Sequence, residues 1–190
     1  MQASLSATDI ACRRGDRLLF RRLSLDLGSG DILQVSGANG TGKSSLLRIL
    51  AGLLPPYAGD VHREGAAGLL DEKPALDEHL PLGKALDFWS AIDGKANPHR
   101  PSDLADLMDV PVRYLSTGQR KRAALARLNS QAPQIWLLDE PLNGLDRDAI
   151  ANVGALVDAH RRANGICVLA SHQPFPLNGI QVLDLAEYAP

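Results

Sequence analysis

The sequence predicts an α/β protein in which a mostly parallel β-sheet is covered by helices on both faces and carries an inserted, smaller helical lobe. Three observations support this fold class. Of the 190 residues 45% are apolar, which is enough for one globular domain with a real core. Strand-like and helical patterns alternate on both sides of the chain's middle, as in parallel sheets. Between Pro55 and Pro111 the composition changes to Pro, Gly and charged residues around short helical patterns.

The N-terminal part begins with a strand-like alternation. Leu23, Leu25 and Leu27 are separated by polar residues, which is typical of a half-buried strand. Residues 28–30 then form a glycine-containing turn, and residues 31–35 read as a short buried strand. A glycine-rich stretch, residues 37–42, leads into Lys43–Leu50, whose apolar spacing predicts a helix packed on a sheet. We therefore expect a strand–loop–helix unit.

The middle of the chain predicts the helical lobe. Residues 83–92 and 102–108 have helical spacing within a region that otherwise lacks long apolar patterns. We interpret residues 1–190 as a single domain. Its core comprises about residues 1–74 and 112–190, and its lobe about residues 75–111 together with the helix that follows Leu115.

Strand and helix patterns return in the C-terminal part. Residues 134–138 are β-like, residues 146–162 carry one apolar stripe at helical spacing, and Ile166–Ala170 is again β-like. Residues 180–183 form a last short strand. His160 falls on the apolar stripe, so we interpret it as a core or boundary residue without a catalytic role.

Composition narrows the classes of partner. The net charge is −2 with basic residues spread along the chain, so we expect no nucleic-acid partner. No apolar run approaches the roughly 20 residues of a membrane-spanning helix. The first residues lack the basic flank and apolar stretch of a secretory signal. Cys12 and Cys167 are solitary, and we expect both to be small buried hydrophobes in a reducing cytosol.

The glycine-rich stretch carries the first chemical motif. Residues 37–44 fit the pattern G-x4-G-K-[ST] of a phosphate-binding loop, in which backbone amides at a helix N-terminus surround a polyphosphate. Lys43 would reach the β- and γ-phosphates, and the Ser44 hydroxyl would ligate Mg²⁺. The alternative is a plain glycine-rich turn, which the position between a strand and a helix disfavours. The candidate ATP-binding residues are Gly37, Ala38, Asn39, Gly40, Thr41, Gly42, Lys43, Ser44 and Ser45.

A second motif places Asp139 and Glu140 at the end of the apolar strand 134–138. Burying two unpaired carboxylates is unfavourable unless a metal ion compensates their charge. We expect Asp139 to bind Mg²⁺ directly or through water, and Glu140 to be the general base that activates the attacking water. Taken alone, this pattern is more typical of a surface turn; downstream of a phosphate-binding loop the catalytic interpretation is favoured.

The third motif is Leu115-Ser116-Thr117-Gly118-Gln119, followed by basic residues and an Ala/Leu-rich helix. Here the sequence resembles the ABC ATPase family, a group of P-loop NTPases whose signature is usually Leu-Ser-Gly-Gly-Gln. The resemblance extends over nearly the whole chain. It implies that Ser116, Thr117, Gly118 and Gln119 bind the γ-phosphate of ATP held by a second copy, in a head-to-tail dimer with two nucleotides between the subunits. Without the family, Ser116 is simply a helix N-cap.

The resemblance assigns further roles. Asp146 matches the Asp of the loop that bridges the dimer interface, although an ordinary helix cap is also compatible. His172 matches the histidine that contacts the γ-phosphate and, here, Glu140. Family members work with integral membrane transporter subunits at the cytoplasmic face of the membrane, so the resemblance implies a peripheral ATPase that drives transport.

Two positions depart from the family pattern. The glutamine that usually contacts Mg²⁺ and water aligns with Lys73, and a charged lysine cannot ligate a metal. The aromatic residue that usually stacks on adenine should precede Gly15, where Arg13 and Arg14 stand; a guanidinium plane can also stack on a purine. We therefore expect hydrolysis that is slow or dependent on a partner.

Within the family, the sequence is most similar to the ATP-binding subunits of cytochrome c biogenesis, the haem exporters. The similarity rests on small size, residues 82–94, and a chain that ends soon after residues 171–174. Phe88 and Trp89 in the lobe line either a groove for a partner's helix or, more commonly, a core. The alternatives are the ATPase of another small-substrate transporter, a nucleotide-gated module with little hydrolysis, and a clamp acting on DNA or ribosomes. The last is disfavoured because such proteins usually carry long coiled coils or two ATPase cores.

Overall fold

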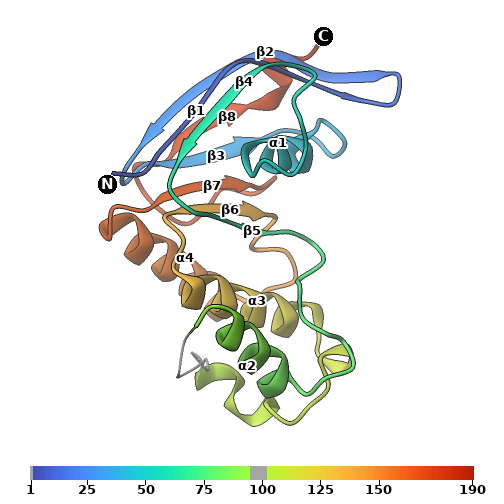
Figure 1. Ribbon diagram of the computed structural model, residues 1–190, viewed down its shortest axis with the longest axis vertical. Coiled ribbons are helices and arrows are strands. Elements are labelled where there is room, and N and C mark those ends of the chain that lie inside the picture. The colour runs from blue at the N-terminus through green and yellow to red at the C-terminus, as the bar shows by residue number, and fades with distance from the viewer. Residues whose placement is uncertain (1, 95–101) are drawn as a thin grey trace.

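The computed structural model describes residues 2–94 and 102–190. At the centre of the molecule lies a five-stranded parallel sheet (Figure 1). The strand order is β5-β6-β7-β3-β8, and every neighbouring pair is parallel. The strands are β3 (Ile32–Ser36), β5 (Ala67–Leu70), β6 (Ile135–Asp139), β7 (Ile166–Ala170) and β8 (Gln181–Asp184). The parallel sheet predicted from the sequence is therefore present.

A second sheet is antiparallel and was not expected from the sequence. Its order is β2-β1-β4, formed by β1 (Ser4–Arg14), β2 (Arg17–Gly28) and β4 (Ala58–Glu64). Only the second half of β2 has a clear alternating pattern. In β1 the pairing register shifts between Ala7 and Ile10, where Asp9 has a φ of 50°, and this irregularity breaks the alternation. Nearly all of β4 is exposed, so it carries no apolar pattern.

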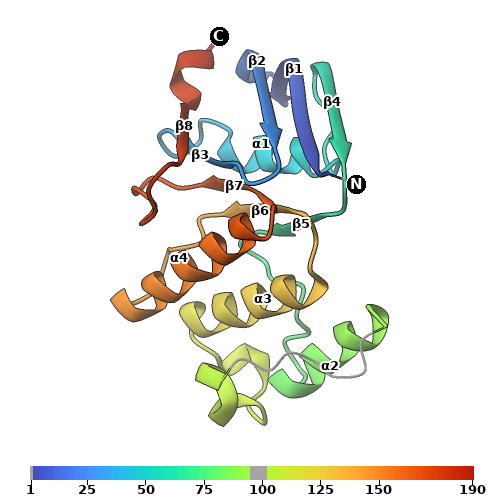
Figure 2. The same cartoon turned by 90° about the vertical axis from the view of Figure 1, so that its left-hand side faces the viewer.

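Helix α1 (Lys43–Leu50) lies between the two sheets (Figure 2). Its buried leucines pack against Leu5 and Phe20 of the antiparallel sheet and against Val35 and Leu137 of the parallel sheet, in one hydrophobic cluster. Residues of β6 alternate between this cluster and one on the opposite face of the sheet, so both faces are buried. Helix α1, which follows the glycine-rich loop, therefore packs firmly on one face of the parallel sheet.

The opposite face of the parallel sheet is covered by α3 (Thr117–Gln131) and α4 (Arg147–Arg162). Trp136 and Leu138 of β6 pack there with Leu125 of α3 and Val157 of α4. The His160 ring stacks on Trp136, with the ring centroids 4.1 Å apart, and burial lowers the pKa of His160. This histidine is therefore a packing residue, as its position on the apolar stripe suggested.

A third hydrophobic cluster joins α2 (Leu82–Ile92), the 3-10 helices η1 (Ser102–Leu107) and η2 (Val112–Tyr114), and the first half of α3. The helix predicted at 83–92 is present, whereas the one predicted at 102–108 is a 3-10 helix followed by a turn. Residues 95–101 of the predicted lobe lie outside the described residues. The domain division stays a prediction.

A last 3-10 helix, η3 (Leu185–Tyr188), follows β8. Both cysteines are buried, as expected. Among the described helices, none has the length and apolar character needed to cross a membrane.

Candidate functional site

The loop between β3 and α1 is shaped by glycines with positive φ, namely Gly37 at 139°, Gly40 at 80° and Gly42 at 112°. The Lys43 ammonium folds back over this loop and donates to the carbonyls of Gly37 at 2.7 Å and Ala38 at 3.2 Å. The Thr41 hydroxyl also donates to the Ala38 carbonyl, at 2.9 Å. These bonds hold the loop in a tight curve around the beginning of the helix.

The N-terminus of α1 is suited to an anion. Gly42 occupies the N-cap position, and no side chain of the described residues caps the first turn. The first amides of any helix lack intrahelical partners and carry the positive end of the helix dipole. Lys43 and the first-turn amides therefore present positive charge in the same place, which is the chemistry that a polyphosphate requires.

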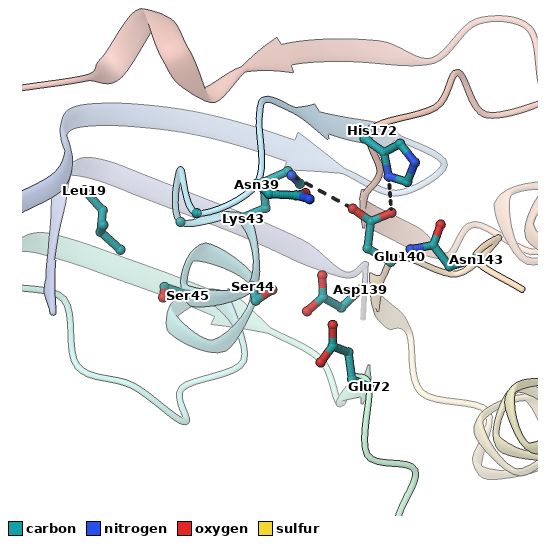
Figure 3. Close-up of a pocket in the computed structure, with 12 residues that line it drawn as sticks. Leu19, Asn39, Lys43, Ser44, Ser45, Glu72, Asp139, Glu140, Asn143 and His172 are labelled. Carbon is teal, nitrogen blue, oxygen red and sulfur yellow. Dashed lines mark hydrogen bonds and ion pairs between the residues drawn. The ribbon is translucent and has the colours of Figure 1, made fainter. Parts of the chain in front are cut away.

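Asp139 ends β6 and faces this loop (Figure 3). Its side chain is 4% exposed, and Oδ1 has no hydrogen-bond partner among the described residues. The pKa of Asp139 is raised, chiefly by burial, while a hydrogen bond with Ser44 opposes that shift. An orphaned, buried carboxylate oxygen beside a serine hydroxyl is the oxygen donor set that Mg²⁺ prefers. The residues present thus fit a magnesium ion.

The described residues contain no group of three His, Cys, Asp or Glu side chains that could hold a metal by themselves. Mg²⁺ commonly takes one or two protein ligands and completes its shell with water and substrate phosphates.

Glu140 follows directly and adopts an uncommon backbone conformation, with a φ of 46°. Its amide donates to the Ala170 carbonyl at 2.9 Å, which extends the pairing of β6 with β7. The carboxylate approaches Lys43, with Oε1 and Nζ 3.9 Å apart, and His172, with Oε2 and Nδ1 3.0 Å apart. Residues held in such backbone regions cluster at functional sites.

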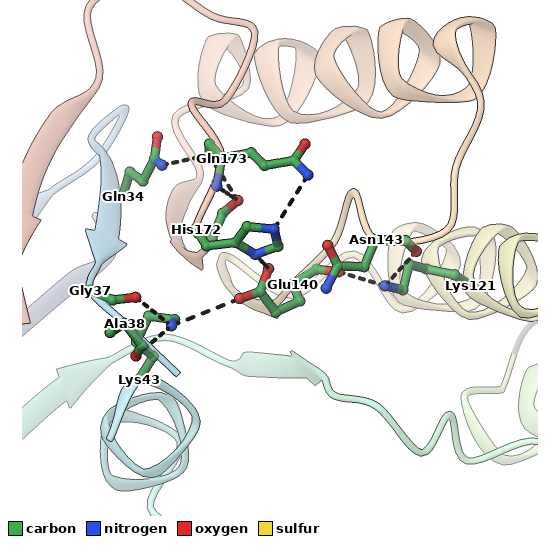
Figure 4. A network of polar contacts seen from close by, with 10 residues as sticks. Gln34, Gly37, Ala38, Lys43, Lys121, Glu140, Asn143, His172 and Gln173 are labelled. Atoms are coloured by element: carbon green, nitrogen blue, oxygen red, sulfur yellow. Dashed lines mark hydrogen bonds and ion pairs between the residues drawn. The ribbon is translucent and has the colours of Figure 1, made fainter. Parts of the chain in front are cut away.

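His172 is held by the segment that follows β7 (Figure 4). Because a carboxylate only accepts, the 3.0 Å contact places a proton on Nδ1. Nε2 then accepts from the side-chain amide nitrogen of Gln173, at 3.3 Å. Gln34, buried in β3, donates to the Gln173 carbonyl at 2.8 Å and accepts from the Phe175 amide at 3.1 Å. A single polar residue in an apolar strand was the only sequence signal for this supporting role.

These groups line one cleft of about 420 Å³. Of the residues predicted from the sequence, most of the loop, both carboxylates and His172 meet there. Gly37, Ala38 and Thr41 are not among the described residues that line the cleft, but they take part in the hydrogen bonds that shape the loop. Leu19, Glu72 and Asn143 also line the cleft and were not predicted as site residues from the sequence. The described residues that line the cleft are Leu19, Asn39, Gly40, Gly42, Lys43, Ser44, Ser45, Glu72, Asp139, Glu140, Asn143 and His172.

Comparison with known proteins places this geometry in a family. Residues 20–143 match the ABC transporter family, about two thirds of the chain. The chain belongs to this family. It is 56% identical over 189 residues to the cytochrome c biogenesis ATP-binding export protein CcmA of Novosphingobium aromaticivorans, covering 100% of this chain and 99% of the relative. The same-named protein of Haemophilus influenzae is 39% identical over 207 residues, covering 98% and 97% of the two chains.

Solved structures of the ABC family share the fold. A metal-chelate type ABC transporter in an inward-facing conformation is 26% identical with a TM-score of 0.79, over 97% of this chain and 79% of that chain. An ABC transporter ATP-binding protein from Pyrococcus furiosus has a TM-score of 0.82 at 20% identity, over 98% and 100% of the two chains, and shows likeness of fold alone.

The ABC signature segment does not itself line the cleft. None of residues 116–119 is among the described residues that line it. Ser116 begins α3 with a complete capping box, in which its Oγ accepts from the Gln119 amide at 3.2 Å and the Gln119 side chain accepts from the Ser116 amide at 2.8 Å. Asp146 caps α4 by accepting from the Ala149 amide at 2.8 Å. The capping interpretations are therefore satisfied within one chain, and the dimer roles stay predictions.

The structure shows which side chains occupy the two places where the sequence departs from the ABC pattern. Glu72, and not Lys73, is the residue of its segment among the described lining of the cleft, so the side chain facing Asp139 is a carboxylate. Arg13 stacks over the Tyr57 ring, 4.7 Å from its centroid, and Leu19 is the apolar residue in the cleft wall. The alignment of Lys73 with the family's glutamine therefore does not describe which residue reaches the site.

The two lobe aromatics have different environments. Trp89 lies under the Arg127 guanidinium, 3.6 Å from the ring centroid, and its indole nitrogen donates to the Ala75 carbonyl. Phe88 contacts Trp89 edge-on but remains 56% exposed. Trp89 thus belongs to the packing of the lobe, while Phe88 is available on its surface.

Proposed function

We propose that this chain is the ATP-binding and ATP-hydrolysing subunit of an ABC exporter of cytochrome c maturation, with haem as the cargo handled by its membrane partners. The observation that carries the hydrolytic part is the placement of Glu140 between Lys43 and His172, beside the glycine-rich loop. The high identity to cytochrome c biogenesis export proteins over the full chain supports the biological role.

ATP would bind with its phosphates at the N-terminus of α1. Gly40 and Gly42 give the loop its curvature, and the Lys43 ammonium lies within reach of both the loop carbonyls and Glu140. Lys43 would exchange its internal carbonyl partners for phosphate oxygens, which are stronger acceptors because they are charged. Leu19 provides apolar surface at the cleft wall.

Asp139 and Ser44 would hold Mg²⁺, which neutralises developing phosphate charge when bound. Asp139 has the unpartnered oxygen for this role, and Ser44 is adjacent to it. Neither residue needs to move a proton. Their task is to fix the position of the bound phosphates relative to Glu140.

Glu140 would accept a proton from the attacking water. Its carboxylate is 15% exposed, so water reaches it from the cleft. His172 orients the carboxylate by donating from Nδ1, and Gln173 keeps the imidazole in that tautomer through Nε2. Positioning and charge stabilisation together account for most catalysis in this class of reaction.

The functional unit would be a head-to-tail pair at the cytoplasmic face of the membrane. Ser116, Thr117, Gly118 and Gln119 of one copy would meet the nucleotide of the other, with Asp146 near the shared interface. Integral membrane subunits would be driven by the closing and opening of this pair. The exposed Phe88 is a candidate contact for such a partner.

Replacement of Glu140 by Gln tests the hydrolytic proposal. We expect steady-state phosphate release to fall by about 100-fold or more, because a neutral amide cannot act as the base. Affinity for ATP should persist, since the loop and Lys43 are untouched. Phosphate release by the assembled complex and titration with a fluorescent ATP analogue measure the two quantities.

Glu187→Gln is the matched control, because it removes an exposed carboxylate from η3. The Glu187→Gln protein should retain both ATP hydrolysis and affinity for ATP. Undiminished hydrolysis in the Glu140→Gln protein would remove Glu140 from the mechanism.

A second candidate function is a nucleotide-gated module with little hydrolysis. The observation favouring it is Glu72, whose negative charge joins Asp139 and Glu140 in the cleft where the family usually has a neutral amide. Phosphate release by the wild-type complex, with and without Mg²⁺, separates the two candidates. Nucleotide binding without Mg²⁺-dependent turnover would favour the module.

A further inference from the structure

The first turns of α3 pack against the tight turn of residues 140–144, which follows β6 and begins with Glu140. This turn is closed by the Asn143 amide, which donates to the Glu140 carbonyl at 3.3 Å. The Lys121 ammonium reaches across from α3 and donates to the same Glu140 carbonyl and to the Asn143 carbonyl, the latter at 3.1 Å (Figure 4). One side chain of α3 therefore binds both ends of the turn.

A backbone contact joins the same two elements independently of Lys121. A Cβ atom added at Gly118 would lie 2.7 Å from the Gly144 carbonyl oxygen, so only glycine permits this approach. Gly144 itself has a φ of 78° and faces Thr117. The segment that caps α3 is thus in direct contact with the turn, so α3 cannot move toward the turn without displacing it.

The backbone of Glu140 needs such support. A non-glycine residue at a φ of 46° persists only where its surroundings fix it, and the direction of its side chain follows from that backbone. On one side the Glu140 amide is fixed to Ala170 of β7. On the other side its carbonyl is fixed by Lys121. The carboxylate is held between these two anchors, facing His172 and Lys43.

Lys121 is half buried, and burial is the main cause that lowers its pKa; the carboxylates of Glu140, Asp139 and Glu72 oppose that shift. An ammonium group is unfavourable in such a place unless its N–H groups have acceptors. The two carbonyls of the turn are those acceptors, which explains why a charged residue is accommodated on this face of α3.

We propose that Lys121 is a positioning residue that couples the signature helix α3 to the orientation of Glu140 in the same chain. Its catalytic part rests on the proposed function. When α3 shifts on meeting the nucleotide of a second copy, Lys121 and Gly118 carry the 140–144 turn with it. Closure on the neighbouring nucleotide thereby adjusts the base at the chain's own nucleotide.

The test compares Lys121→Met, which keeps the length of the side chain but cannot donate, with Lys121→Arg, which can donate to both carbonyls. Arg122→Met is the matched control. It removes another cation from α3. Among the described residues, the Arg122 guanidinium forms its ion pair with Asp103, at 2.8 Å, and not with the 140–144 turn. Hydrogen–deuterium exchange of residues 140–146 is measured on the full chain. The kinetic constants kcat and KM for ATP are measured on the assembled complex.

In Lys121→Met we expect exchange in the 140–146 segment to rise about tenfold or more, with the glycine-rich loop unchanged. We expect kcat to fall on the order of 10- to 100-fold while KM stays within about twofold, because a misplaced base affects the chemical step and not ATP binding. Lys121→Arg should restore most of kcat, and Arg122→Met should match the wild type. If the methionine variant does not fold, Lys121→Leu, which also cannot donate to the carbonyls of the turn, is measured in the same way.

Unchanged exchange at 140–146 would overturn the proposal whatever the hydrolysis rate. Increased exchange with undiminished kcat would also overturn it, since the turn would then be held without consequence for Glu140. A fall in kcat that arginine does not rescue would assign Lys121 a role other than donation to the turn. If the wild-type complex itself hydrolyses no ATP, the proposed function fails, and the exchange data alone then decide whether Lys121 holds the turn.

Discussion

Helices α1 and α3 both begin at a short segment of small residues, but the amides of their first turns have different partners. At α1 the N-cap is Gly42, and no side chain of the described residues accepts from the first turn. At α3 the Ser116 side chain and the Gln119 side chain satisfy each other's backbone amides in a capping box. At α1 no side chain of the described residues caps the helix end, whereas at α3 the Ser116 and Gln119 amides are both paired within the chain.

The same contrast extends to the neighbouring side chains. The cleft at α1 holds the buried Asp139 with its unpartnered oxygen and Glu140 with positive φ. Around α3, Lys121 and Gly118 have close partners in the 140–144 turn. Unsatisfied groups lower stability, and sites that bind charged ligands commonly retain them. The difference shows that the end of α1 offers unpaired groups to an anion, whereas the cap of α3 is formed within the chain; a role for α3 at the nucleotide of a second copy stays a prediction.

Of the variants that test this difference between α1 and α3, Gly42→Ala should have the largest effect on stability and on ATP affinity. At a φ of 112° an alanine is strained, and its Cβ would lie 3.2 Å from Leu19 and from Phe20. We expect the free energy of unfolding to fall by ~2–3 kcal/mol, from strain and crowding together. The affinity for ATP should fall by about tenfold or more because the loop must shift. Urea denaturation and titration with a fluorescent ATP analogue measure the two effects.

Gly15→Ala is the control for backbone strain alone. Gly15 has a φ of 58°, and an added Cβ would meet no described atom within 4 Å. It should lower stability by ~1–2 kcal/mol and leave ATP affinity unchanged. Equal losses of ATP affinity in both variants would contradict the role given to the open end of α1.

The cleft could be predicted from the sequence largely because its motifs are local. The glycine-rich loop with Lys43 and the Asp139–Glu140 pair each lie at the end of an apolar strand, and parallel strands bring such ends to one edge of the sheet. The parallel sheet itself followed from the alternation of strand and helix patterns along the chain. These features depend on spacing along the chain, which the sequence displays.

The missed features depend on contacts between distant segments. Glu72 enters the cleft through the path of the chain after β5, and its sequence neighbours gave no reason to prefer it to Lys73. The bonds of Gln34 to residues 173 and 175, and those of Lys121 to the 140–144 turn, span separate elements. The antiparallel sheet was missed because β4 is exposed and β1 is irregular at Asp9. Spacing along the chain does not record such pairings.

Asp139→Asn should have the opposite effect on stability to Gly42→Ala, because it removes an unfavourable buried charge from the cleft. In the absence of Mg²⁺ and nucleotide we expect the free energy of unfolding to rise by ~0.5–2 kcal/mol, because a neutral amide is less unfavourable to bury than an unpaired carboxylate. Urea denaturation in EDTA measures this. Asp26→Asn, at an exposed position, is the control and should change stability by less than ~0.5 kcal/mol. A destabilised Asp139→Asn protein would show that the buried carboxylate of Asp139 does not lower the stability of the empty chain.

Ser116→Asp should have the smallest effect on stability and separates the two interpretations of α3. Asp and Ser are comparable N-caps, so the free energy of unfolding should stay within ~0.5 kcal/mol of the wild type. Affinity of the single chain for ATP should also be unchanged, because Ser116 is not among the described residues that line the cleft. If Ser116 meets the γ-phosphate of a second copy, the added negative charge repels it, and hydrolysis by the assembled complex should be lost. A fully active, fully stable Ser116→Asp complex would leave Ser116 as a helix cap and nothing more.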